Sequence, residues 1–128
     1  MKLFIAVAFL VISIVSCKKN QENGHTLSSL QHTWSIISEN GEAYRYVGVS
    51  GDYYNFSTNG RLYRHTASTD DTSKYTLNSS GQILSLYPIT DNVPSTTGTN
   101  YQITRLNDSL LILSSVGGSF FVTDSLKR

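Results

Sequence analysis

The side chains that most often carry catalysis or metal binding are sparse in this chain. His25, His32 and His65 are its only histidines, and their spacing matches no metal-ligand motif. Asp70 and Asp71 pair two carboxylates, but their Ser/Thr-rich surroundings are typical of a solvated loop. No serine or glycine pattern indicates a nucleophile elbow or a phosphate-binding loop. We therefore predict no catalytic residue, no metal site, no cofactor and no enzymatic activity. A buried acid or histidine with a strongly shifted pKa beside a cleft would reopen the question of an enzyme.

Tyrosine is the residue type that most suggests a binding function, because the chain has eight of them among 128 residues. An apolar ring with a polar tip suits a pocket for an amphipathic molecule. The alternative is that tyrosine is simply a favourable strand residue. The binding hypothesis requires several of these rings near the open end of a barrel. Its candidate ligand-binding residues are Tyr54, Phe56, Tyr63, Tyr87 and Tyr101.

Cys17 is the only cysteine, which excludes a disulfide and a cysteine-based metal site. It follows Lys2 and the almost wholly apolar run 3–15. That run is too short to span a bilayer, which takes about 20 residues. A positive start, a short apolar stretch and a small residue before a cleavage site are typical of a secretory signal.

The residues Ile14-Val15-Ser16-Cys17 resemble the lipobox of bacterial lipoprotein precursors. The resemblance implies cleavage before Cys17, a diacylglyceryl group on its thiol and a fatty acid such as palmitate on the new amine, which together anchor the protein to a membrane. Lys18 after the cysteine favours the outer membrane over the inner one, and the absence of an acidic run favours the periplasmic leaflet over the cell surface. An ordinary signal peptide with a chance cysteine is the alternative, and surface exposure stays open.

Three segments follow from this organisation. They are a signal peptide at 1–16, a lipidated cysteine with a polar tether at 17–25 and one domain at 26–128. Only 15% of the residues are charged and the net charge is +1, with no basic stripe for a nucleic acid.

The domain is predicted to be all-β, after a short helical turn at 26–31 that Thr26 caps. Turn signals such as Asn40-Gly41 and Asn59-Gly60 separate short strand-like runs. The predicted strands are 33–38, 43–49, 53–57, 61–66, 74–77, 82–87, 100–106, 109–115 and 119–126. Residues 67–73 and 90–99 are predicted loops, and Pro88 is predicted to end its strand. Eight or nine strands in succession favour an antiparallel meander that closes into a barrel, with a two-sheet sandwich as the alternative.

The order of motifs resembles the small lipocalin-like lipoproteins of Bacteroidetes-type bacteria. The matching residues are Leu30 and Trp34 at the start, Tyr54, Phe56, Asn59, Gly60 and Leu62 in the centre, and Tyr101, Ile103, Leu106, Leu110 and Ile112 near the end. The resemblance implies a lipocalin-like barrel in which Trp34 closes one end, with Arg105 or Arg128 as candidates to stack on it. His32 departs from the family, which has glycine two residues before the tryptophan.

The resemblance implies binding of a small hydrophobic or amphipathic ligand, and a barrel filled by its own side chains would contradict it. The alternative is a protein-interaction module of the cell envelope that uses the loops at 67–73 or 90–99. Ser50-Gly51-x-x-Tyr54 is similar to a loop of periplasmic lysozyme inhibitors, which is one form of that alternative. An exposed apolar patch near those loops would favour it.

Overall fold

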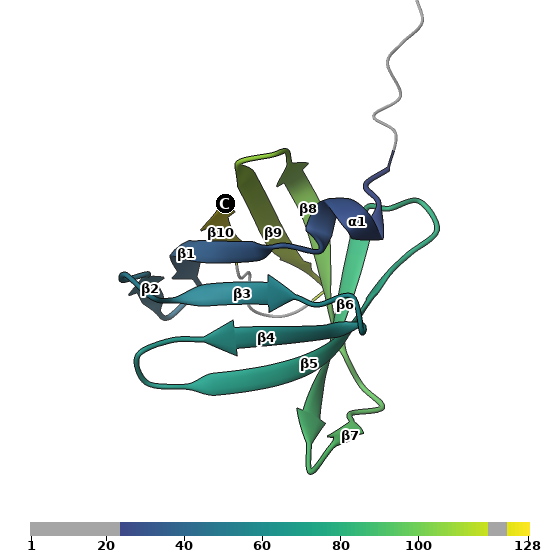
Figure 1. Cartoon of the computed structure of the whole chain (residues 1–128), viewed down its shortest axis with the longest axis horizontal. Helices are drawn as coiled ribbons and strands as arrows, with labels where there is room; N and C mark the ends of the chain where they lie inside the picture. The colour runs from purple at the N-terminus through teal and green to yellow at the C-terminus, as the bar shows by residue number, and fades with distance from the viewer. Residues whose placement is uncertain (1–23, 118–122) are drawn as a thin grey trace, which may run out of the picture.

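The computed structural model describes residues 24–117 and 123–128 and is nearly all β (Figure 1). The single helical turn in this part of the chain is α1 (Leu27–Leu30), with Thr26 as its N-cap, as expected. The strands are β1 (Thr33–Asn40), β2 (Arg45–Val47), β3 (Tyr53–Phe56), β4 (Arg61–His65), β5 (Asp70–Leu77), β6 (Ile83–Thr90), β7 (Val93–Pro94), β8 (Thr99–Leu106), β9 (Leu110–Val116) and β10 (Thr123–Lys127).

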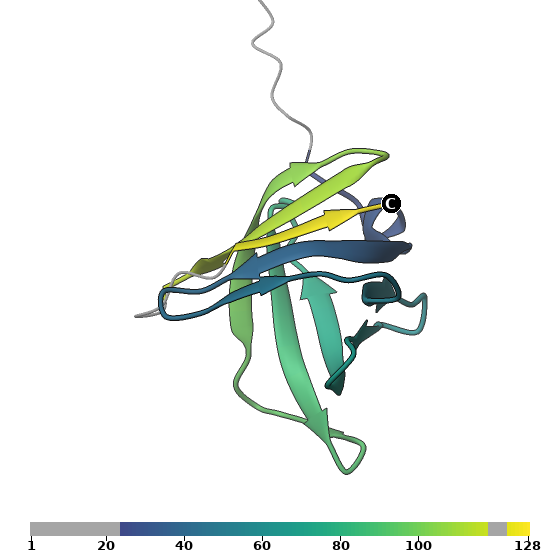
Figure 2. The same cartoon turned by 90° about the vertical axis from the view of Figure 1, so that its left-hand side faces the viewer.

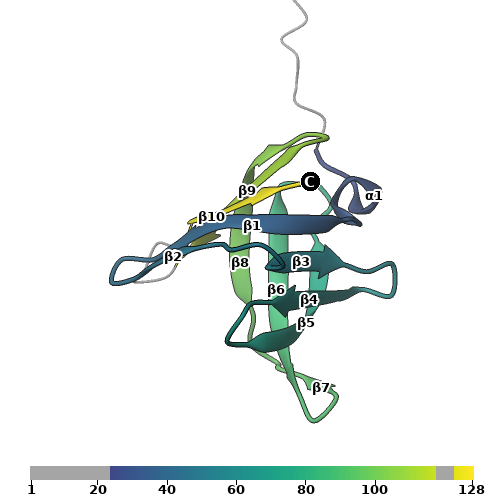
Figure 3. The same cartoon turned by 60° about the vertical axis from the view of Figure 1, so that its left-hand side comes forward.

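Eight of these strands form a closed antiparallel barrel. Each strand of the ring pairs with its neighbour in sequence order, β1-β3-β4-β5-β6-β8-β9-β10, and β10 pairs back onto β1. Figures 2 and 3 show β1 and β3 running across the direction of β6 and β8, as the walls of a twisted barrel do. The predicted barrel is therefore confirmed and the two-sheet sandwich is wrong, because the last strand closes on the first.

The two remaining strands, β2 and β7, extend single hairpins beyond the ring. Residues 43–49 were expected to form one strand, but only β2 is extended, and it pairs with the end of β1. The predicted loop at 90–99 contains β7, which folds back on β6. Asp91 and Asn92 have φ values of 52° and 64°, the left-handed conformation of a tight hairpin turn. Short polar residues tolerate this conformation, so the hairpin forms without glycine.

Two predicted strand boundaries are wrong, namely the start of β5 and the end of β6. Asp70 and Asp71 begin β5 instead of tipping a loop, because they pair with His65 and Arg64 of β4. Pro88 does not end β6, which continues to Thr90. It lies beyond Leu86, the last residue of β6 that pairs with β8, where only the short β7 hairpin lies alongside and one missing N–H is tolerated.

One end of the barrel is filled by apolar side chains and capped by α1. Leu30 of the helical turn, Trp34, Phe56, Leu84 and Leu111 are each less than 2% exposed and belong to one core cluster. The Trp34 indole N–H donates to the carbonyl of Leu30 at 3.0 Å, which ties the turn to the ring and satisfies the buried donor. We call this end of the barrel the closed end.

The contact on Trp34 differs from the one that the family resemblance implied. His32 meets the indole edge-on, with 6.2 Å between the ring centroids. Neither Arg105 nor Arg128 makes a cation–π contact with it within the described residues, and both arginines are exposed. At the position where the resemblance implied glycine, an imidazole therefore packs against Trp34.

Candidate functional site

The opposite, open end of the barrel contains a cavity of about 490 Å³. Its wall is partly apolar, from Leu62, Leu86, Pro88 and Ile89, and partly polar. The polar and aromatic lining residues are Glu39, Tyr44, Tyr54, Arg64, Asp70, Asp71, Thr72, Ser73, Thr90, Tyr101 and Asp124. A concave site with one apolar wall and a few convergent polar groups is the usual form of a small-molecule site.

A buried ion pair between Glu39 and Arg64 lies in the polar wall. Arg64 Nη2 lies 2.6 Å from Glu39 Oε2, and Arg64 Nε donates to Oε1 at 2.7 Å. The Glu39 side chain is 2% exposed. Burial alone would raise the pKa of Glu39, but the hydrogen bonds from Arg64 and Tyr54 and the charge of Arg64 outweigh it and lower that pKa. Hydrogen bonds from within the protein therefore satisfy both oxygens of the Glu39 carboxylate.

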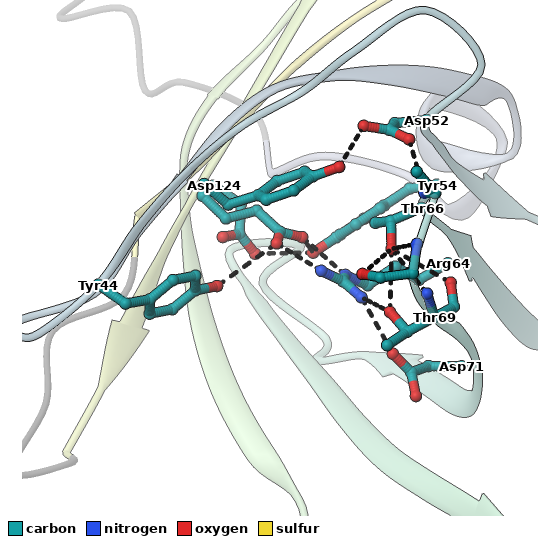
Figure 4. A network of polar contacts seen from close by, with 12 residues as sticks. Tyr44, Asp52, Tyr54, Arg64, Thr66, Thr69, Asp71 and Asp124 are labelled. Carbon is teal, nitrogen blue, oxygen red and sulfur yellow. Dashed lines mark hydrogen bonds and ion pairs between the residues drawn. The ribbon is translucent and has the colours of Figure 1, made fainter.

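Asp124 lies directly across the strand pair from Glu39. Burial, with the charge of Glu39 as a second cause, raises the pKa of Asp124 to about 7. The Tyr54 hydroxyl lies between the two acids, 2.7 Å from Glu39 Oε1 and 3.1 Å from Asp124 Oδ2 (Figure 4). A hydroxyl has one hydrogen to donate, so it serves both acids fully only when Asp124 carries a proton and donates to the tyrosine oxygen. Near neutral pH the Glu39 carboxyl group is thus ionised, whereas that of Asp124 is still partly protonated.

The rim of the cavity adds further polar contacts to Arg64. Its Nη1 donates to Thr69 Oγ1 at 2.9 Å and to Asp71 at 3.0 Å. Asp71 is largely exposed, so this second pair orients the guanidinium and contributes little stability. Asp70 pairs with the imidazole of His65, which also stacks on Tyr53 outside the cavity.

A second polar cluster surrounds Asp52 and holds two loops together. Its carboxylate accepts hydrogen bonds from the Tyr46 hydroxyl and from the backbone N–H groups of Val49 and Ala67. These contacts, the Tyr46 bond first, keep the pKa of Asp52 below its usual value. Within the Ser50-Gly51-x-x-Tyr54 segment, Gly51 forms the exposed turn with a φ of 99°, whereas Tyr54 is buried inside the barrel.

Of the five candidate ligand-binding residues, the structure brings Tyr54 and Tyr101 to the cavity. Phe56 points inward at the closed end, 1% exposed, as part of the core. Tyr63 and Tyr87 lie on the outer face, because each alternates with inward neighbours on its strand. Burial raises the pKa of Tyr101 to about 12, with help from the nearby acids, so its hydroxyl remains neutral.

The candidates predicted from the sequence did not include four residues that carry hydrogen bonds of the polar wall, namely Tyr44, Glu39, Arg64 and Asp124. Strand alternation places Arg64 on the same face as Leu62, and Asp124 on the same face as Leu126, so two of them were accessible from the pattern. Glu39 was not, because a bulge between Ile36 and Ser38 changes the face on which later β1 residues lie.

Comparison with known proteins adds no further assignment: no protein-family model, no curated protein and no solved structure matches this chain significantly. Within residues 24–117 and 123–128, no three His, Cys, Asp or Glu side chains are grouped to hold a metal ion. No helix of the described chain is long and apolar enough to cross a membrane. Cys17 and the expected signal peptide lie outside the described residues.

Proposed function

We propose that this chain is a lipocalin-like lipoprotein of the cell envelope, anchored through Cys17, whose barrel binds a small amphipathic molecule at its open end. The observation that carries the binding function is the cavity of about 490 Å³ with apolar and polar walls. Its size lies within the range of about 300–1,000 Å³ that is typical of ligand pockets. Three of the eight tyrosines line it, which is the arrangement that the binding hypothesis requires.

The packing of the closed end supports the same proposal. Its packed core holds the barrel together, so the open end does not have to be filled for the fold to be stable. The lipocalin-like assignment is supported by the eight-strand closed meander and by Trp34 packed at the closed end, together with the order of motifs in the sequence.

Occupancy of the cavity is tested with two phenylalanine variants on one strand. Ser73 lines the cavity, whereas Thr76 on the same strand is exposed on the outer face. The full chain, purified gently from the parent bacterium, is expected to retain a small molecule in native mass spectrometry. Thr76→Phe should retain the same molecule and Ser73→Phe should lose it. Retention by Ser73→Phe, or no adduct in any form, would contradict binding in the cavity.

The lipid anchor is tested separately at Cys17. The intact mass of the mature protein should show a diacylglyceryl group and an added fatty acid, and the protein should fractionate with outer membranes. Cys17→Ser should abolish the modification and the membrane association. An unmodified Cys17 in the wild type would instead support an ordinary secretory signal.

A protein-interaction module is the second candidate, and exposed apolar side chains favour it. Tyr44, Val47 and Val49, on and beside β2, are each more than half exposed, as is Val93 in the segment 90–99. Single exposed apolar residues are common, but neighbouring ones indicate a contact surface. Val47→Ser with Val49→Ser should release a stable partner if this candidate is correct, and should leave the cavity-bound molecule in place if it is not.

An enzyme is the least favoured function, although Asp124 meets the condition that would reopen it. A buried acid with a raised pKa beside a cavity is also what a general acid needs. The other buried acid, Glu39, is occupied by Arg64 on both oxygens and is not free to act with it. Recovery of the bound molecule unchanged after incubation with the protein would support binding, and its conversion would support catalysis.

A further inference from the structure

Asp124 and Glu39 are neighbours in the cavity wall, but their hydrogen bonding is very different. Glu39 accepts from Arg64 twice, from Tyr54 and from Tyr44 at distances between 2.6 and 3.4 Å. The Asp124 side chain has one hydrogen bond, of 3.1 Å between its Oδ2 and the Tyr54 hydroxyl. Its other oxygen, Oδ1, is buried and has no hydrogen-bond partner among the described residues. Since buried carboxyl oxygens normally have partners, the missing one needs an explanation.

The charges that line the cavity indicate what kind of partner would fit. Among the described lining residues, three carboxyl groups, those of Glu39, Asp71 and Asp124, lie near one guanidinium, that of Arg64, while the fourth, Asp70, pairs with His65. Arg64 is already shared between Glu39 and Asp71. The described lining residues therefore carry excess negative charge, and among them an anionic ligand would find no cation that is free. A ligand with hydrogen-bond donors and a positive charge would satisfy Asp124 and offset this excess.

We infer that the polar end of the ligand is a compact cation with N–H donors, a primary ammonium group, held by Asp124, while its apolar body contacts Leu62, Leu86 and Ile89. This inference rests on the proposed function of the cavity. The ammonium group donates to the unsatisfied carboxylate, and Tyr54 keeps its hydrogen bond to Glu39. Asp124 releases its proton to solvent when the cation binds, so one positive charge replaces another beside Glu39.

The test uses three soluble probes that share one tail and differ in the head group: hexylamine, hexanol and hexanoate. Binding to the full chain in lipid nanodiscs is measured by saturation-transfer NMR against empty nanodiscs. Hexylamine should bind at least ~10-fold more tightly than hexanoate, with hexanol between them. Asp124→Asn should weaken hexylamine about tenfold and leave hexanol unchanged. Asp108→Asn removes an acid from the exposed β8–β9 turn and should change neither.

A pH series on the wild type tests the same point without a substitution. The groups that face Asp124 are Glu39 from β1, Tyr54 from β3, Arg64 from β4, Tyr101 from β8 and Tyr44 from the β1–β2 loop. Among these and Asp124 itself, only Asp124 has its pKa near 7. Hexylamine affinity should therefore rise roughly tenfold from pH 6 to pH 8, while hexanol affinity stays constant.

The outcomes separate this inference from the proposed function. Hexanol binding with equal affinities for amine and carboxylate, or an amine affinity that Asp124→Asn and pH leave unchanged, would overturn the cationic head group and leave the cavity as a ligand site. Failure of all three probes to bind would count against the cavity itself.

Discussion

The two ends of this barrel are built from the same strands, but apolar side chains fill the closed end, whereas charged side chains line a cavity at the open end. At the closed end Trp34, Phe56, Leu84 and Leu111 fill the interior, and Leu30 of α1 completes the packing. At the open end the same alternation of side chains directs Arg64 and Asp124 inward, next to a cavity of about 490 Å³. Apolar packing is favourable wherever water is excluded, whereas buried charges need partners. Apolar packing therefore dominates one end of the barrel, and buried charges lie at the other.

Glu39 and Arg64 show how the open end tolerates this arrangement. The ion pair satisfies both oxygens of Glu39, so burying that charge does not leave an unpaired anion. Asp124 has no such cation and instead holds a proton near neutral pH. Both oxygens of Glu39 are therefore satisfied within the protein, whereas one oxygen of Asp124 has no hydrogen-bond partner among the described residues.

The largest expected effect is at the closed end. Trp34→Ala should lower the free energy of unfolding by ~3–5 kcal/mol, because it leaves a cavity in the core and removes the hydrogen bond to Leu30. Urea denaturation of the full chain measures it. Molecules that remain folded should still bind the probes, and a loss below about 1 kcal/mol would place the main source of stability elsewhere.

The next effect is at Arg64. Arg64→Met should cost about 2–3 kcal/mol, below the full value for a buried pair because Arg64 is partly exposed to water. The loss should be largest at neutral pH and shrink as pH falls, because buried Glu39 without Arg64 takes up a proton more readily, whereas wild-type Glu39 stays charged to below its usual pKa of 4.5. Adding Glu39→Gln to Arg64→Met should recover much of the stability. An equal loss in the single and double variants would show that packing, and not charge, is responsible.

A pH-dependent effect is expected at Asp124. The folded protein holds a proton on Asp124 up to about pH 7, whereas the unfolded chain releases it near its usual pKa of 3.8. The free energy of unfolding therefore falls as pH rises through this window, by an amount on the order of a few kcal/mol. Glu39 has its pKa lowered, so its contribution is lost only on the acid side. Denaturation at pH 5 and pH 8 should show the decline in the wild type and in Asp108→Asn, and not in Asp124→Asn.

The smallest effects are expected on the outer face of the barrel. Tyr63→Phe and Tyr87→Phe should each change the free energy of unfolding by less than ~0.5 kcal/mol and leave probe binding unchanged. Tyr101→Phe, on the inner face, should weaken hexylamine binding with little change in stability. A stronger effect on binding at Tyr87 than at Tyr101 would place the ligand outside the cavity.

The sequence determined the elements that depend on local pattern. Turn residues such as Asn59-Gly60 and the placement of Tyr54 and Phe56 on one face of their strand indicated a meander, and the need to hide its two edges favoured closure into a barrel. Boundaries were wrong where pairing prevailed over local signals, as at Asp70 and Pro88. Only two of the five candidate ligand-binding residues reach the cavity. The other three do not, because the sequence of a strand does not indicate which of its faces is inside or which end of the barrel is open.

The arrangement of the charged groups at the open end depends on long-range pairing. A bulge after Ile36 turns Glu39 inward, and the closure of β10 on β1 places it opposite Asp124, 85 positions along the chain. Arg64 arrives from a third strand to neutralise one of the two acids and not the other. Register and bulges depend on long-range pairing, whereas alternation is a property of one strand by itself. The closure of the barrel therefore determines which of these side chains come together, and local sequence patterns do not.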